Sequence, residues 1–199
     1  KSRLYYHSID HLMDNYSQRP LAMGMMQMFS EATSDDVGLN LDVSVPRGLH
    51  TLRIGTGFHY NELDAYQQNA MTGMQQDTFN DAYRARVGTY GEWQADWTSR
   101  WTTQVAVRND TLMIETSDIE RYNAMGGAAD DADAFNAQGH DFVDVNFDVT
   151  ASARWTASDY ATYELSFARK NRSPSLLERY LWTPLSARAG LADGRTYIG

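Results

Sequence analysis

The sequence contains no cysteine, no long apolar run and no excess of basic side chains. Without cysteine the chain has no disulfides, thiolate metal ligands or cysteine nucleophile. No stretch of about 18 apolar residues occurs, so no membrane-spanning helix is predicted. A net charge of −9 argues against a nucleic-acid partner, because phosphate binding requires a clustered basic surface. These absences leave open a β-barrel, whose strands alternate apolar and polar residues and therefore average to a hydrophilic composition.

The beginning of the chain also lacks two features. KSRLYYHSID has neither an initiator methionine nor the apolar core of a signal peptide. We therefore expect a processed chain or a piece of a longer protein. With 199 residues, we treat 1–199 as a single, incomplete domain.

Alternation with a period of two is the dominant feature of the sequence. In DDVGLNLDVSV, residues 35–45, one face is valine and leucine and the other is aspartate, glycine, asparagine and serine. We expect about seven such strands, each of about 10 to 16 residues, which is long for a globular domain. The seven segments are RLYYHSIDHLM, DDVGLNLDVSV, TLRIGTGFHY, VGTYGEWQADW, WTTQVAVRND, DFVDVNFDVTASARW and YATYELSFARK.

The connections between these segments alternate between short and long. Short turns are expected at 46–49, 98–100 and 156–159. The long connections are expected at 14–34, 61–80 and 112–139, and from 171 onward. Outer-membrane barrels have this regularity, with short periplasmic turns and long extracellular loops.

Aromatic residues cluster at the ends of the expected strands. Trp97, Trp101 and Trp155 flank short turns, whereas Tyr60 and Tyr83 lie near long connections. All five share the apolar side of their strands, as expected for two membrane interfaces. The alternative is aromatic packing inside a soluble β-sandwich.

The sequence therefore predicts an all-β fold, an antiparallel up-and-down transmembrane β-barrel fragment. Seven strands cannot close a single-chain bacterial barrel, which has an even strand number, so we expect an incomplete wall. One helix is expected, at 173–182, with Ser173 as N-cap and Pro174 as its first residue.

Several stretches resemble the barrel domain of TonB-dependent outer-membrane receptors, and in particular the copper receptors. They are DHLMDNYSQRP, HYNELDAY, WTTQVAVRND, and SFARKNRSPSLLERYLW followed by DGRTYIG. The resemblance implies a bacterial outer-membrane barrel of about 22 strands closed around an N-terminal plug. It also implies transport energised by the TonB complex. The chain contains neither plug nor TonB box, so such coupling belongs to the full-length protein.

The resemblance also implies a copper site. An H-x-M pair on the barrel wall of the copper receptors works with plug ligands, and His11 and Met13 match it here. Residues two apart on a strand point to one face, about 6.5 to 7 Å apart at Cα. Imidazole suits copper, and thioether favours Cu(I). The alternative is a solvated histidine beside a methionine that packs against the plug.

Other groups are weaker metal candidates. His7 and His11 would lie about 13 Å apart on a strand, so they cannot share one ion. Methionines in the first long connection could capture soft ions or simply line the loop, and those of the next connection would extend the group. These methionines are Met23, Met25, Met26 and Met28, followed by Met71 and Met74.

Acidic and other charged residues are expected to have structural roles. The aspartates of 126–141 lack the spacing of an EF-hand, so we expect a solvated, mobile loop there. Charges on the lumen side are expected to pair with one another or with the plug. The first group is Asp130, Asp131, Asp133 and Asp141; the second is Arg84, Arg86, Glu92, Arg108, Asp144, Asp148 and Glu164.

No catalytic motif is present: the sequence has no G-x-S-x-G, P-loop or dinucleotide fingerprint. The resemblance to the copper receptors makes copper import the leading hypothesis. The first alternative is a receptor for a siderophore or another metal chelate, recognised by residues such as Arg121, Tyr122 and Arg179. The second is a soluble β-sandwich binding module.

Overall fold

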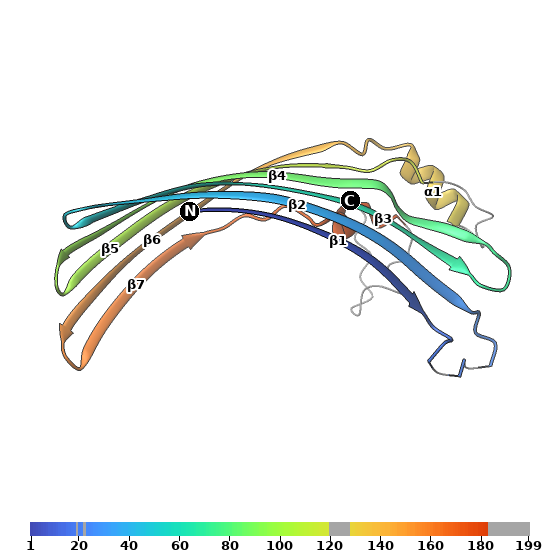
Figure 1. Cartoon of the computed structure of the whole chain (residues 1–199), viewed down its shortest axis with the longest axis horizontal. Helices are drawn as coiled ribbons and strands as arrows, with labels where there is room; N and C mark the ends of the chain where they lie inside the picture. Colours follow the sequence, from blue (N-terminus) through green and yellow to red (C-terminus); the bar gives the residue numbers. More distant parts are fainter. Residues whose placement is uncertain (19, 22, 120–127, 183–199) are drawn as a thin grey trace.

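The computed structural model describes residues 1–18, 20–21, 23–119 and 128–182. It contains one antiparallel sheet in which seven strands follow one another in chain order (Figure 1). The strands are β1 (Ser2–Asp14), β2 (Met28–Arg47), β3 (His50–Asn69), β4 (Gln75–Thr98), β5 (Trp101–Glu115), β6 (Phe142–Ser158) and β7 (Ala161–Arg169). This arrangement confirms the predicted up-and-down topology.

The strands are longer than the sequence pattern indicated. β2 and β3 have 20 residues each and β4 has 24, so β3 and β4 are joined by only 70–74. The predicted long connection at 61–80 is therefore wrong. Beyond Tyr60, positions that were apolar become Glu62 and Asp64, while strand pairing continues. The alternation changes there because the outer positions become polar, whereas Leu63 and Ala65 occupy inner positions and pack in a hydrophobic cluster. The backbone ladder does not end.

One side of the sheet, here called the outer face, is apolar and exposed. The register aligns Leu39 of β2, Phe58 of β3 and Val87 of β4 in one row. No described element covers this face, which includes Leu41, Val43, Val45, Leu52, Ile54, Val105, Val107, Val143, Val145, Phe147, Leu165 and Phe167. A sandwich would bury such a face against a second sheet, but the described residues form a single sheet.

Aromatic side chains border the apolar band at both ends. Near the short turns, Trp93 packs edge-to-face on Trp97 and Trp155 stacks on Tyr163. At the opposite end of the band, Tyr60 stacks on Tyr83, with ring centroids 5.8 Å apart. The register places these rings on the outer face, as the sequence predicted.

The opposite side, the inner face, carries polar and charged side chains. Arg53 bonds Glu92 on the neighbouring strand, and Arg108 bonds Asp110 two residues along its own strand. The seven charged residues predicted for the lumen side all occupy this face by register. Several pair as expected, whereas Arg84 has no ion-pair partner in the described part of the chain.

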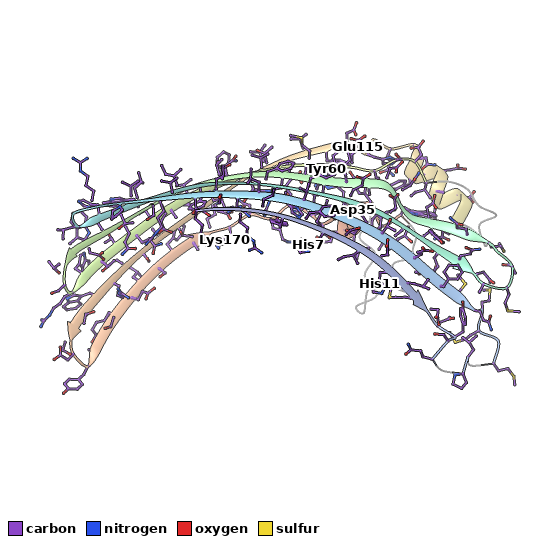
Figure 2. The ribbon with its side chains drawn as sticks, in the orientation of Figure 1. His7, His11, Asp35, Tyr60, Glu115 and Lys170 are labelled. Atoms are coloured by element: carbon purple, nitrogen blue, oxygen red, sulfur yellow. The ribbon has the colours of Figure 1, made fainter. Side chains whose placement is uncertain are left out.

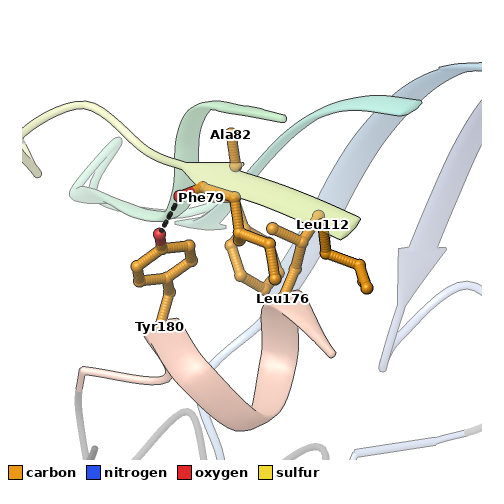
Figure 3. Close-up of a cluster of buried hydrophobic side chains, with 6 residues drawn as sticks. Phe79, Ala82, Leu112, Leu176 and Tyr180 are labelled. Atoms are coloured by element: carbon orange, nitrogen blue, oxygen red, sulfur yellow. Dashed lines mark hydrogen bonds between the residues drawn. The ribbon is translucent and has the colours of Figure 1, made fainter. Parts of the chain in front are cut away.

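A short helix, α2 (Leu176–Tyr180), packs on the inner face near the long connections (Figure 3). Leu176 and Tyr180 are buried against Phe79, Ala82 and Leu112. The phenol of Tyr180 donates to the carbonyl oxygen of Ile114, 3.0 Å away. This cluster attaches the segment after β7 to β4 and β5.

The predicted start of this helix is wrong. The N-cap is Ser175, not Ser173, and Pro174 lies before the helix. Ser175 and Glu178 form a reciprocal capping box, which satisfies two backbone N–H groups at once. The hydroxyl of Ser173 instead accepts a bond from Asn146 of β6.

A second helix, α1 (Ala128–Asn136), lies where a mobile acidic loop was predicted. Alanine has the highest helix propensity, and the segment AADDADAFN is rich in it. Asp130 and Asp131 occupy the first turn, where carboxylates interact favourably with the helix dipole. None of the helices in the described residues, α1 and α2 included, is long and apolar enough to cross a membrane.

Candidate functional site

His11 and Met13 lie on β1, toward the end that leads into the first long connection (Figure 2 labels His11). In the register, His11 is opposite Ala32 and Met13 is opposite Ser30, both on the inner face of β2. Leu12 is opposite Glu31 and points the other way. The structure therefore brings the imidazole and the thioether to the same face, and both are exposed.

The surroundings of this pair are small and neutral. The next strand continues the two rows with Ala65 and Gln67, neither of which is a strong metal ligand. The described residues contain no group of three or more His, Cys, Asp or Glu side chains that could hold an ion. The two side chains are thus an incomplete ligand set, exposed on a strand whose other edge is unpaired in the sheet.

His7 belongs to a different cluster, nearer the middle of β1 (Figure 2). It lies opposite Asp36, which accepts a bond from the Nε2 atom of His59 at 2.9 Å. The ring of Tyr5 contacts both imidazoles, with centroids 5.8 and 6.2 Å away. His7 is therefore part of an aromatic and acidic patch of the wall, separate from His11.

The methionines of the two neighbouring connections meet at the tip of the sheet. The amide of Asn69 donates to the sulfur of Met26, 3.2 Å away, and the N–H of Ala70 donates to the carbonyl of Gln27. Met71 follows directly in the 70–74 turn and is exposed. The register aligns Met28 with Asn69, so the two groups of methionines that the sequence placed in separate loops are side by side.

Their thioethers differ in exposure. Met23 and Met25 project into solvent, and Met26 is half exposed. Met28 and Met74 are partly buried between the strands and the turn. The exposed members are available to a soft ion, whereas the others also serve as packing.

The structure also contains a pocket that strand pairing alone did not predict. It has a volume of about 340 Å³ and lies between α1, α2 and the start of β6. Phe135 stacks on His140 at 4.2 Å, and Tyr180 and Trp182 complete an aromatic wall. Burial raises the pKa of the Tyr180 phenol above its usual range, so this phenol remains protonated and donates.

Arg179 is at the rim of this aromatic pocket. It bonds Asp144 at 2.6 Å, and its guanidinium lies over the ring of Phe142 at 4.4 Å. Of the three residues expected to recognise a chelate, Arg121 and Tyr122 lie outside the described residues. The pocket forms between segments that are distant in the sequence. The sequence alone showed only that aromatic residues are frequent after residue 135.

Comparison with known proteins concerns the fold. No family model matches the sequence, and no curated protein matches it. Among solved structures, the chain is similar to the copper transporter OprC, with a TM-score of 0.72 and 20% identity. The match covers 90% of this chain and 28% of that one, so the chain spans little more than a quarter of the transporter's length. The likeness shows that this sheet has the fold of part of that chain.

Proposed function

We propose that this chain forms part of the wall of a bacterial outer-membrane, TonB-dependent transporter that imports copper. The observation that carries the proposal is the likeness to a copper transporter, together with His11 and Met13 on one face of β1. The plug and the TonB complex would act through the full-length protein.

The outer face would contact lipid. Its apolar band runs from Val37 to Val45 along β2, about 27 Å at the rise of a strand, and aromatic rings border it on neighbouring strands. This length suits the apolar band of an outer-membrane barrel, which is about 25 Å tall.

On the inner face, His11 and Met13 would supply one imidazole and one thioether to copper. This combination of ligands favours Cu(I), and the neutral side chains around it leave room for further ligands from outside the sheet. The exposed methionines Met23, Met25 and Met26 would act earlier, as weak contacts at the tip.

The test uses the purified full-length protein. We expect His11→Ala and Met13→Ala each to weaken copper binding at least about tenfold, measured by titration with Cu(I) under a competing chelator. His7→Ala is the matched control, since His7 lies on the same strand and face but belongs to another cluster. Equal affinities for all variants and the parent would contradict the proposed ligands.

A second candidate is a receptor for an organic metal chelate, and the aromatic pocket favours it. A volume of about 340 Å³ lined by Phe135, Tyr180 and Trp182 suits a small organic ligand, with Arg179 beside it. Trp182→Ala should then abolish uptake of the chelate and leave Cu(I) affinity unchanged. The opposite pattern would favour direct copper ligation.

A further inference from the structure

We propose that Arg84 anchors a second site on the inner face, one that binds the carboxylate or phosphate group of a small molecule. This site is distinct from the His11 and Met13 pair and from the aromatic pocket. The proposal does not depend on copper import, because the same site would also serve a receptor that takes up another anionic solute.

The site is a pocket of about 320 Å³ between the sheet and the segment that leads into α2. Its floor is made by Asn61 of β3 and Arg84 of β4, which are directly opposite each other in the register. Its other wall is made by Arg172, Ser173, Ser175, Leu176 and Leu177. The segment reaches this position because Leu176 and Tyr180 are buried in the cluster on β4 and β5.

The side chain of Arg84 has no hydrogen bond or ion pair within the described part of the chain, and its Nε atom is buried without a partner. Other inner-face arginines are engaged: Arg53 bonds Glu92, and Arg108 bonds Asp110. A buried N–H group without an acceptor destabilises the folded state, and does so more strongly when it is charged. The position therefore requires an acceptor that these residues do not supply.

The charges around Arg84 favour an anion as that acceptor. The positive charges of Arg86 and Arg172 repel the Arg84 guanidinium, whereas the carboxylate of Asp110 attracts it. Asp110 already accepts two bonds from Arg108, and Glu178 is bonded by Arg172. The local carboxylates are thus occupied, and positive charge is left over in the pocket.

Hydroxyl groups complete the donor set. Ser173 accepts a bond from Asn146, and Ser175 accepts one from the N–H of Glu178. Neither hydroxyl donates to another described residue, so each can offer its proton to an oxygen atom in the pocket. A guanidinium fork with hydroxyl donors matches carboxylate and phosphate oxygens, and its positive charge disfavours a metal cation.

The size of the pocket indicates a solute rather than a single side chain. A volume of about 320 Å³ falls within the range of small-molecule sites, roughly 300 to 1,000 Å³. One carboxylate from another part of the full-length protein would fill only a fraction of it. We therefore assign the site to a free anion such as a polycarboxylate or a phosphate.

The test is calorimetric titration of the full-length protein in detergent with citrate and, separately, with inorganic phosphate. We expect saturable binding, a loss of affinity of about tenfold or more for Arg84→Gln, and a smaller loss for Arg84→Lys, which keeps the charge but not the fork. Arg154→Gln is the matched control, since Arg154 lies on the inner face in a different depression, with Gln104 and Glu164. The control should bind like the parent.

Two results would overturn the proposal. One is equal weakening by Arg84→Gln and Arg154→Gln, which would reflect only overall charge. The other is no binding of either anion by the parent protein, together with a lower melting temperature for Arg84→Gln. That combination would mean that a side chain from elsewhere in the protein already occupies Arg84. Measurement of Cu(I) affinity in the same variants separates this outcome from failure of the copper proposal.

Discussion

The ring of Tyr90 lies directly across Gly55, and its phenol reaches Asp42 on the strand beyond. The three residues occupy one row across β4, β3 and β2, and the hydrogen bond to Asp42 is 2.9 Å long. A Cβ atom on Gly55 would be 2.2 Å from the Cε1 atom of Tyr90. Glycine is therefore required at this position by the close approach of the ring, as in other sheets where an aromatic residue covers a glycine.

Replacement of Gly55 by alanine should displace Tyr90 and break its bond to Asp42. We expect a loss of stability of about 1 to 3 kcal/mol, measured as a lower temperature for loss of the folded form in detergent. Gly91→Ala is the control, because Gly91 is on the same strand as Tyr90 and a Cβ there would meet nothing within 4 Å. Similar losses for both variants would contradict the role assigned to the ring.

Charge on the outer face should prevent membrane assembly, whereas charge on the inner face should not. Leu41 lies midway along the apolar band, and Asn40 is the adjacent residue on the inner face. We expect Leu41→Lys to cost about 2 to 4 kcal/mol and to lower the amount of protein assembled in outer membranes. Asn40→Lys should assemble at nearly the parental level. If the two levels are equal, the outer face does not contact lipid.

The attachment of α2 to the sheet should depend on one phenol. The single phenol proton of Tyr180 is shared between the carbonyls of Ile114 and His140, and its ring is buried. Tyr180→Phe leaves these acceptors without that donor and should cost about 1 to 2 kcal/mol. Limited proteolysis of the 170–182 segment should become faster. Tyr160→Phe, at a fully exposed turn position, should have no effect, and faster cleavage in that variant would count against the specific bond.

The same segment should loosen in acid. The hydrogen bond from Arg172 and the N–H of Ser175 hold the pKa of Glu178 at about 2, below its ordinary value of 4.5. The ionised form is the one that stabilises the fold, so its contribution is complete above pH 4.5 and is lost as the pH falls toward 2. Hydrogen exchange of the Leu176–Tyr180 amides, corrected for intrinsic rates, should show this loss. Glu178→Gln should exchange faster at neutral pH and respond less to acid; an unchanged acid response would point to another group.

The sequence predicted the strands in which apolar and polar side chains alternate from one residue to the next. Strands such as 35–45 and 51–60 have one lipid-like and one polar face, so the period of two identifies them directly. From Glu62 to Asn69 the outer positions are polar and the apolar residues Leu63 and Ala65 lie on inner positions, so the pattern of the preceding residues is not continued. That is why the sheet extends well past its predicted end.

Contacts between distant segments account for the remaining differences. The sequence predicts Ser173 as the N-cap because Ser173 and Pro174 also form a favourable helix start. In the structure Ser173 accepts a bond from Asn146, and Ser175 is the N-cap. His11 and Met13 could be placed on one face from spacing alone. The pocket around Arg84 could not, because its second wall comes from residues about 90 positions later in the chain.

β2 and β3 extend beyond the aromatic band. This extension keeps the tip of the sheet far from the arginines in the middle of the inner face. From Tyr60 to Asn69 the strand rises on the order of 30 Å, several times the Debye length of about 8 Å at physiological ionic strength. An ion held by the uncharged thioethers at the tip would be screened from the arginines and carboxylates of the inner face. The carboxylates near it are those of Asp14 and Glu31, beside Met28. Added salt should therefore weaken capture at the tip only through these two neighbours and not through the arginines of the wall.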